Sequence, residues 1–367
     1  MSSKQAATLS RMLDEMLSLP EERRAAWVDG LADELADLKP RLHALLARSA
    51  QLGEDALMAT LPKLTEFADS SVAHFRTGHE VGARVGPYCL VRQLGIGAMG
   101  VVWLAQRSDG IPPAHVALKF AHVAARRSDL QARLSREHQL LLALDHPNIA
   151  RLFAADVTSE GQPYLVLEYV AGLPLHEYVA AYRPGIVSRL RLFLQLTRAV
   201  AHAHGCQIVH RDLKPANVMV TEHHTVRLLD FGIGKLLAHG LPAELQLSRA
   251  TGQPLTPAYA SPEQLLGAPV GLPSDVYSLG VVLYELLTGQ RPHALERGAN
   301  LSLRTSILEH TPVAPSTLYP HESLGALSAS QRAELDAIIG RALQKVPSAR
   351  FASAHELASA IEHVLRI

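Results

Sequence analysis

The eight residues HRDLKPAN, at positions 210–217, bring an imidazole, a guanidinium, a carboxylate and an ammonium close together in the chain. Short apolar runs, QIV and VMV, flank them, so we expect a hairpin whose polar tip presents side chains outward. Asp212 can accept a proton from a hydroxyl group, and Lys214 can offset charge on a phosphoryl group during its transfer. Asn217 offers a neutral oxygen ligand. These residue types suit phosphoryl transfer, although a polar surface turn would contain similar ones.

A second acidic residue ends another apolar run, LLDFG, in which Asp230 follows Asn217 by 13 residues. If the two runs form adjacent strands, the two side chains can supply oxygen donors to one hard cation such as Mg²⁺. The joint occurrence of HRDLKPAN and DFG is much harder to explain as decorated surface turns than either motif alone. We therefore predict that both motifs belong to one phosphoryl-transfer site.

The motif GIGAMG, with Gly95, Gly97 and Gly100, lies between two β-prone runs. Tight turns select glycine for conformational reasons alone, so a plain hairpin is an equal alternative for this motif. A dinucleotide-binding fingerprint is excluded because a strand follows the glycines where that fingerprint needs a helix. The other interpretation is a glycine-rich hairpin that covers the phosphates of a nucleotide with unobstructed backbone N–H groups.

Lys119 ends the apolar part of the next β-prone run, VALK. A lysine at such a place most often extends its amine to the surface. Glu137 changes this expectation because it lies among apolar positions on the inward side of the next predicted helix, residues 128–146. A carboxylate that faces a core needs a cation. We therefore expect an ion pair between Lys119 and Glu137.

Composition limits the kinds of protein that this chain can be. Its 367 residues are 48% hydrophobic, which is enough for a large core and more than one domain. Lys plus Arg equals Asp plus Glu at 35 each, so no net charge favours a nucleic acid or an anionic membrane as partner. We find no leader-like start, no apolar run of about 18 residues, and two cysteines. A cytoplasmic protein without a disulfide framework is expected.

The 19 histidines invite a metal site, above all at the pairs His202 with His204 and His223 with His224. Neither pair has a third ligand at a fixed spacing, so we expect these side chains to be solvated. Cys206 follows a helix-terminal glycine and is expected to be a small buried hydrophobe.

Periodicity divides the chain into parts. Leu and Met at helical spacing predict helices within residues 1–59, followed by a polar, glycine-containing linker at 60–86. These helices are expected to pack as a small bundle, with self-association or partner docking as alternatives. Short β-prone runs separated by glycine or proline turns dominate residues 87–170, and amphipathic helices dominate residues 171–367. The predicted fold class is α+β.

Taken in order, the glycine-rich run, VALK, HRDLKPAN and DFG resemble the motifs of a bacterial Hanks-type serine/threonine protein kinase, over residues 87–367. The resemblance implies the bilobal kinase fold, with a small antiparallel β-rich N-lobe at 87–170, a larger α-helical C-lobe at 171–367, and ATP between them. It also implies a hinge at residues 168–170 and a gatekeeper at Leu167. The residues that would contact the adenine or the phosphates are Leu94, Gly95, Gly97, Gly100, Val102, Ala117, Lys119, Glu168, Val170 and Met219.

By the same resemblance, Lys119 would hold the α- and β-phosphates and pair with Glu137, and Asp212 would be the catalytic base. Asn217 and Asp230 would hold Mg²⁺. Lys214 is typical of kinases that phosphorylate serine and threonine in protein substrates. The resemblance also implies that Thr256 shapes a pocket beside the acceptor and that Glu263 and Arg350 form an ion pair that fixes the activation segment. Asp275 would brace the backbone of the catalytic loop. A stacked regulatory spine would consist of His210, Phe231, Leu141 and Leu152.

Arg211 precedes Asp212, which in this family usually implies control by a phosphorylated activation loop. The position where many relatives carry the phosphosite is Gly252 here. We therefore hypothesise that Thr251 is autophosphorylated, with Ser248 as the alternative. A pseudokinase that binds nucleotide without chemistry is the competing interpretation, although no residue of the catalytic set is missing. These motifs do not encode the physiological substrate, the activating signal or the oligomeric state.

Overall fold

The computed structural model describes residues 26–31, 39, 79–97, 100–111, 114–121, 144–230, 257–293, 303–318 and 327–366. Backbone contacts divide the chain into two compact units, Met1–Gly78 and His79–Ile367. In the first unit, residues 26–29 are helical and Val28 is fully buried. Almost all of the rest of the predicted helical region and the first part of the predicted linker lie outside the described residues.

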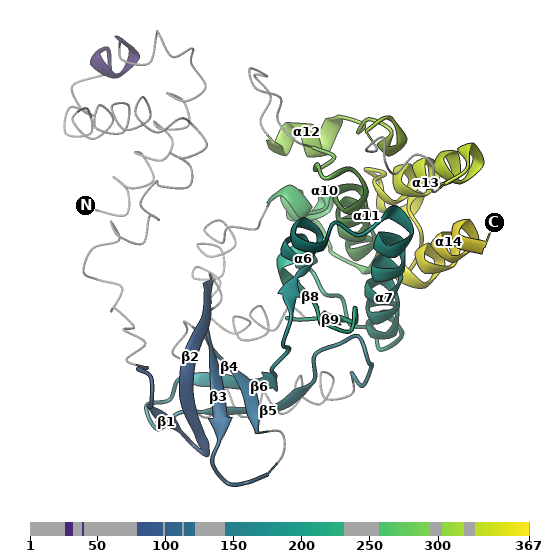
Figure 1. Cartoon of the computed structure of the whole chain (residues 1–367). Helices are drawn as coiled ribbons and strands as arrows, with labels where there is room; N and C mark the ends of the chain where they lie inside the picture. Colours follow the sequence, from purple (N-terminus) through teal and green to yellow (C-terminus); the bar gives the residue numbers. More distant parts are fainter. Residues whose placement is uncertain are drawn as a thin grey trace. The chain divides into compact units, whose positions relative to one another are not determined.

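The second unit begins with a six-stranded antiparallel sheet in the spatial order β1-β2-β3-β4-β6-β5 (Figure 1). The strands are β1 (Arg84–Val85), β2 (Tyr88–Gly97), β3 (Gly100–Arg107), β4 (His115–Ala121), β5 (Leu152–Val157) and β6 (Pro163–Glu168). Aliphatic and aromatic side chains of this sheet form a core of their own, which includes Leu90, Val101, Trp103, Leu118, Phe120 and Val166. Such residues favour a pleated, half-buried surface, so the β-prone runs of the sequence fold as expected.

Helices dominate the rest of this unit. They are α6 (Leu175–Tyr182), α7 (Ile186–Gly205), α10 (Pro262–Leu266), α11 (Leu272–Thr288), α12 (Leu303–Glu309), α13 (Ala329–Ala342) and α14 (Ala354–Arg366). A three-stranded sheet of β7 (Leu173–Pro174), β8 (Val218–Val220) and β9 (Val226–Leu228) lies beside α6 and α7 (Figure 1). The predicted α+β class, with a β-rich N-lobe followed by a helical C-lobe, is confirmed.

Helix α11 lies at the centre of the C-lobe core. Fourteen of its 17 residues are buried, and a helix that is buried on every side is typical of a domain interior. Gly280 permits close contact with α13, because a Cβ at this position would lie 2.9 Å from the Cβ of Ala342. The apolar sequence of α11 therefore serves packing. Among the described residues, no helix is long and apolar enough to cross a membrane.

The prediction of a hairpin around HRDLKPAN is wrong for its first strand. The VMV run forms β8, but the QIV run is not a strand. The Ile208 N–H donates to the Ala203 carbonyl oxygen at the end of α7, 2.9 Å away. The backbone N–H groups of His210 and Arg211 donate to the carboxylate of Asp275. These backbone groups are therefore not available for a strand ladder, and the loop follows α7 directly.

His204 is buried, which contradicts the expectation that it is solvated. Its Nε2 lies 3.0 Å from Asp275 Oδ2, and its Nδ1 accepts a hydrogen bond from the backbone N–H of Ala354. Periodicity identified the helix end but could not show that α14 packs over it. The pair at 223–224 is exposed, as expected. Cys206 is half-buried and packs against the C-lobe core.

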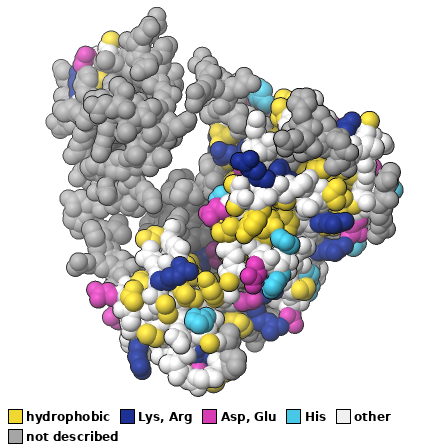
Figure 2. All heavy atoms as spheres, viewed as in Figure 1, with side chains coloured by type: hydrophobic (Ala, Val, Ile, Leu, Met, Phe, Trp, Pro, Cys, Tyr) yellow, Lys and Arg dark blue, Asp and Glu magenta, His cyan; other side chains and the backbone are white. Residues whose placement is uncertain are grey.

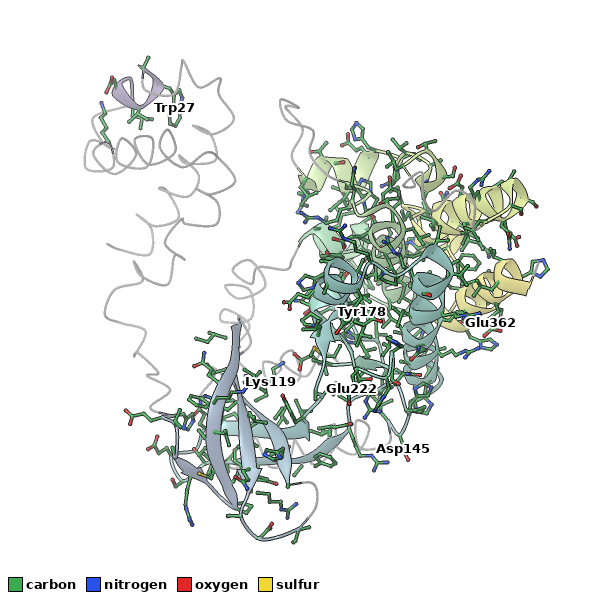
Figure 3. All side chains as sticks on the ribbon, in the orientation of Figure 1. Trp27, Lys119, Asp145, Tyr178, Glu222 and Glu362 are labelled. Carbon is green, nitrogen blue, oxygen red and sulfur yellow. The ribbon has the colours of Figure 1, made fainter. Side chains whose placement is uncertain are left out.

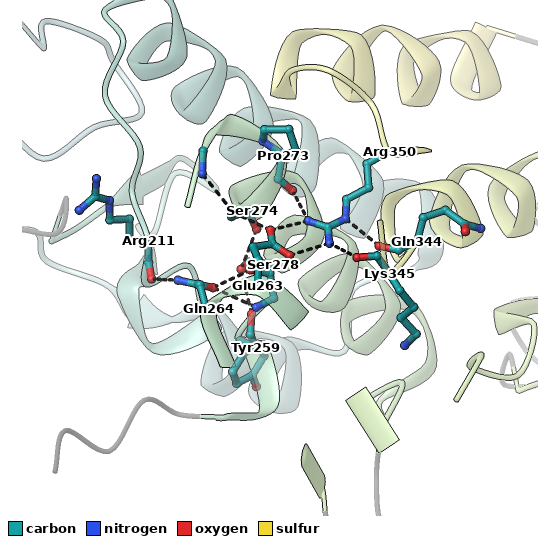
Figure 4. Close-up of polar contacts among 12 residues, drawn as sticks. Arg211, Tyr259, Glu263, Gln264, Pro273, Ser274, Ser278, Gln344, Lys345 and Arg350 are labelled. Atoms are coloured by element: carbon teal, nitrogen blue, oxygen red, sulfur yellow. Dashed lines mark hydrogen bonds and ion pairs between the residues drawn. The ribbon is translucent and has the colours of Figure 1, made fainter. Parts of the chain in front are cut away.

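A buried ion pair joins α10 to the turn before α14 (Figure 4). The guanidinium of Arg350 donates to Glu263 Oε1 and Oε2 at 2.7 and 2.8 Å, and Ser274 Oγ donates to Glu263 Oε1 at 2.6 Å. Arg350 also donates to the carbonyl oxygens of Pro273, Gln344 and Lys345. Burial raises the pKa of Glu263, but the hydrogen bonds from Arg350 and Ser274 outweigh it and lower that pKa to about 2. The ion pair that the sequence implied is therefore present.

We expect Glu263→Gln to destabilise the protein in a pH-dependent way. At pH 7 the variant leaves the Arg350 guanidinium buried without its counter-charge, which costs about 3–5 kcal/mol. Because folding lowers the Glu263 pKa from 4.5 to about 2, the stabilisation from the ionised carboxylate is present above about pH 4.5 and is lost as the pH falls toward 2. Denaturant unfolding at several pH values should show a stability gap between wild type and variant that narrows in acid.

The matched control is Glu222→Gln, because the Glu222 side chain is 87% exposed. Its unfolding free energy should follow that of the wild type at every pH. A Glu263→Gln gap that keeps the same size between pH 7 and the acid limit would contradict the assignment.

Candidate active site

Three of the predicted site residues contact one another in the loop between α7 and β8, which we call the catalytic loop (residues 210–217). Lys214 Nζ donates to Asp212 Oδ2 at 2.8 Å, and Asn217 Nδ2 donates to the same oxygen at 3.1 Å. Asn217 Nδ2 also donates to the Asp212 carbonyl oxygen at 2.8 Å. The 3-10 turn η3 (Pro215–Asn217) returns Asn217 to Asp212. The side chains of Asp212 and Lys214 stay 20% and 24% exposed, so both can meet a ligand.

Lys119 and Asp230 form an ion pair that links the sheet of the N-lobe to the C-lobe. Lys119 lies on β4 (Figure 3), its side chain is 8% exposed, and its Nζ is 2.7 Å from Asp230 Oδ1. Asp230 has a φ of 55°, which is uncommon for a residue other than glycine and often marks a functional site. The carboxylate compensates a nearly buried ammonium. The expected partner of Lys119, Glu137, lies outside the described residues.

The catalytic loop is braced by Asp275, which is 1% exposed in the first turn of α11. Its Oδ2 accepts from the His210 N–H at 2.7 Å, and its Oδ1 accepts from the Arg211 N–H at 2.9 Å. Arg211 has a φ of 68°, a conformation that needs such support in a non-glycine residue. Its carbonyl oxygen accepts from Gln264 Nε2 at 2.8 Å, while its guanidinium extends away from the Glu263–Arg350 pair (Figure 4).

A cavity of about 580 Å³ lies between the two lobes. Its lining includes Leu94, Gly95, Val102, Ala117, Leu167, Glu168 and Val170 from the N-lobe and hinge, and Asn217, Met219 and Asp230 from the C-lobe. Hydrophobic side chains lie on both lobes in the space-filling view (Figure 2). Gly97 and Gly100 do not line the cavity but pair with each other at the tip of the β2–β3 hairpin. Lys119 does not line the cavity either, but its ammonium contacts Asp230, which does.

Sequence reasoning missed part of this lining, including Arg92, Gly172, Leu173 and Glu177. A Cβ on Gly172 would lie 2.3 Å from the Val220 carbonyl oxygen, so glycine alone lets the segment after the hinge approach β8 this closely. The glycine that ends the apolar run EYVAG was the available signal. Arg92 and Glu177 carry no comparable signal, because isolated charged residues are usually solvated.

Several predicted residues lie outside the described part of the chain, namely Leu141, Phe231, Thr256 and the candidate phosphosites Ser248 and Thr251, as does Glu137. Their roles stay predictions. Two members of the implied spine are described. Leu152 is buried, and His210 is fully buried with its Nε2 2.9 Å from the Leu229 carbonyl oxygen. The catalytic loop is thereby joined to the residue that precedes Asp230.

We expect Asp275→Asn to loosen the catalytic loop. The amide presents a donor where the carboxylate accepts from a backbone N–H group, so at least one buried N–H loses its partner, at a cost of about 1–3 kcal/mol. Hydrogen exchange should show faster exchange of the His210 and Arg211 amides, and thermal unfolding should shift downward. Asp145→Asn, at a side chain 77% exposed, is the control. Unchanged exchange at His210 and Arg211 would show that the loop is held by other contacts.

Comparison with known proteins gives a consistent result. The profile of the protein kinase domain matches residues 88–363. The chain is 36% identical over 295 residues to the serine/threonine-protein kinase Pkn1 of Myxococcus xanthus. This match covers 78% of this chain and 39% of that protein. It is 35% identical over 275 residues to the serine/threonine-protein kinase PknB of Mycobacterium tuberculosis. This match covers 74% of this chain and 41% of that protein. The chain thus spans about two fifths of the length of these relatives.

A solved structure is similar as well. The kinase domain of Mycobacterium tuberculosis PknI matches with a TM-score of 0.57 and 27% sequence identity, over 79% of this chain and 100% of that domain. With the matched kinase profile, this similarity confirms the predicted bilobal kinase fold, with its β-rich N-lobe and helical C-lobe. The chain therefore belongs to the protein kinase domain family, among homologues from bacterial serine/threonine kinases.

Proposed function

We propose that this chain transfers the γ-phosphoryl group of ATP to serine and threonine hydroxyls of protein substrates. The observation that carries the proposal is the contact set of Asp212, Lys214 and Asn217, since Asn217 also lines a cavity of the size that small-molecule ligands occupy. A carboxylate oriented by an ammonium and an amide is suited to accept a proton from an alcohol. The similarity to curated serine/threonine kinases supports the same activity.

The apolar part of the cavity would hold the adenine ring. Leu94, Val102 and Ala117 come from the N-lobe sheet and Met219 comes from β8, so a flat base would lie between side chains of both lobes. The hinge, residues 168–170, would present backbone groups to the edge of the base. The glycines of the β2–β3 hairpin leave backbone N–H groups unobstructed for the phosphates.

Asn217 and Asp230 fit a Mg²⁺ site. Both line the cavity, and both offer oxygen, the donor that this hard cation prefers. The hydrogen bonds from Asn217 to Asp212 use the amide nitrogen, so they leave the amide oxygen for another contact. Bound Mg²⁺ would neutralise charge on the β- and γ-phosphates. Lys119, which pairs with Asp230 here, would hold oxygens of the α- and β-phosphates.

In the reaction, Asp212 accepts the proton of the acceptor hydroxyl while the hydroxyl oxygen bonds to the γ-phosphorus. The bond from the γ-phosphorus to the oxygen that bridges the β- and γ-phosphates breaks, and ADP leaves. Lys214, 2.8 Å from Asp212 Oδ2, is positioned to stabilise the charge of the transferring group. Asn217 keeps the Asp212 carboxylate in place through the same oxygen.

We expect Asp212→Asn to lower phosphotransfer by at least about 10²-fold, because removal of a general base costs about 10²–10⁴-fold. Transfer of labelled phosphate from ATP to a generic protein substrate, followed by phosphoamino-acid analysis, measures both the rate and the acceptor. Asp109→Asn is the matched control, because it makes the same change in the exposed loop after β3. Equal labelling by wild type and Asp212→Asn would refute the enzyme assignment, and label on tyrosine alone would refute the choice of acceptor.

Arg211 supports control of this activity by a phosphate. Its guanidinium is not part of the Glu263–Arg350 network (Figure 4), and an arginine next to the catalytic base is suited to bind a phosphorylated residue. Thr251 is our preferred acceptor within the chain, with Ser248 as the alternative.

After incubation with ATP and Mg²⁺, mass spectrometry should detect phosphate on the peptide that contains Thr251. The Asp212→Asn protein, incubated alone, should carry none, because the phosphate comes from the chain's own activity. Thr251→Ala should lower phosphotransfer to an added substrate. Phosphate confined to sites distant from residues 248–251 would refute autophosphorylation of this segment.

A further inference from the structure

A second charge pair lies at the hinge itself. Arg227, on β9, donates through one guanidinium nitrogen to Glu168 Oε2 and through another to the carbonyl oxygen of Pro147. Glu168 is the last residue of β6. The side chains of Arg227 and Glu168 are 19% and 30% exposed, so the pair is largely removed from water. A charge-assisted contact in such surroundings is stronger than one on an open surface.

The pair belongs to a closed set of contacts. Glu168 Oε2 also accepts from the Arg151 N–H at 3.1 Å, and the Glu168 N–H donates to the Arg151 carbonyl oxygen at 2.8 Å. The segment before Arg151 is bonded to β9 in turn, because the Leu228 N–H donates to the Asn148 carbonyl oxygen and the Ala150 N–H donates to the Leu228 carbonyl oxygen. The end of β6, residues 147–151 and β9 therefore hold one another.

The hinge and the residues that follow it border two cavities. Glu168, Tyr169, Val170, Gly172 and Leu173 line the cavity assigned to the nucleotide, and the same five residues line a second cavity of about 660 Å³. Where a segment borders a cavity it lacks the contacts of a packed core, although Val170 is buried and Leu173 pairs with Val220 of β8. The polar contacts of the Glu168 side chain therefore add to the backbone pairing that fixes the position of this segment.

The anchor comes from the strand that leads to the proposed metal site. Arg227 precedes Asp230 by three residues, so β9 carries both the contact to the hinge and the approach to the phosphate end of the cavity. We propose that Arg227 is a positioning residue that holds the hinge and Asp230 at a fixed separation, so that one nucleotide reaches both. This inference rests on the proposed ATP site, and it adds a residue that never touches the nucleotide.

The test is Arg227→Met, which keeps a long side chain and removes the charge. The KM for ATP should rise about tenfold, within the range that coupling through such contacts covers, while kcat changes by less than about threefold because the catalytic loop is intact. Direct titration with a fluorescent ATP analogue and Mg²⁺ should show the same loss of affinity. Arg227→Lys should restore part of it, since an ammonium keeps the charge but not the forked geometry.

Glu168→Gln should weaken nucleotide binding as well. The double variant with Arg227→Met should bind the nucleotide no more weakly than the single variant with the lower affinity, because each change removes the same Arg227–Glu168 ion pair. The control is Arg198→Met, which removes an arginine from a pair with Glu362 between α7 and α14 (Figure 3) and should leave KM and nucleotide affinity unchanged. Thermal unfolding of each variant shows that it is folded.

Unchanged KM and nucleotide affinity in folded Arg227→Met, strictly additive losses in the double variant, or higher activity would overturn the inference. If Arg227→Met does not fold, Arg227→Lys and Glu168→Gln decide by the same measurements. A failure of the proposed function is distinguishable: the wild type would then bind the nucleotide analogue without transferring phosphate, and the loss of binding in Arg227→Met would still support the positioning role.

Discussion

The carboxylate of Asp275 is the contact on which the geometry of the site depends. It is almost completely buried, and it accepts from two successive backbone N–H groups of the catalytic loop and lies within hydrogen-bond distance of His204. Arg211 lies in a left-handed conformation that few non-glycine residues adopt. Without an acceptor at this place, the turn that brings Asp212 to Lys214 and Asn217 would leave buried donors unsatisfied.

The same carboxylate contacts His204, whose tautomer follows from its other hydrogen bond. The backbone N–H of Ala354 is always a donor, so His204 Nδ1 must be an acceptor, and Nε2 carries the proton that it donates to Asp275. One neutral imidazole therefore joins α7, α11 and α14 to the catalytic loop. The Glu263–Arg350 pair is connected to this region by Ser274, which precedes Asp275 in the chain and donates a hydrogen bond to Glu263. The C-lobe thus supports the loop with a charged framework inside an apolar core.

The sequence predicted the fold well because its motifs carry strong local signals. Short β-prone runs followed by amphipathic helices identified the two lobes, and residue type and spacing selected Asp212, Asn217 and Asp230 as candidates. What it could not predict depends on contacts between distant segments. The QIV run has the composition of a strand, but α7 and Asp275 already bond its surroundings. His204 looked solvated because no pattern shows that α14 covers the end of α7.

The ion pair between Lys119 and Asp230 has a consequence for how an anionic ligand enters. Lys119 is nearly buried, and the cost of removing its ammonium from water is already met when the chain folds, because Asp230 stands beside it. A triphosphate at the proposed ATP site would replace one negative partner of Lys119 with another. Binding there would therefore be an exchange of counter-ions at Lys119. Its free energy would depend on whether the ammonium interacts more favourably with phosphate or with the Asp230 carboxylate, and less on any new dehydration of the lysine.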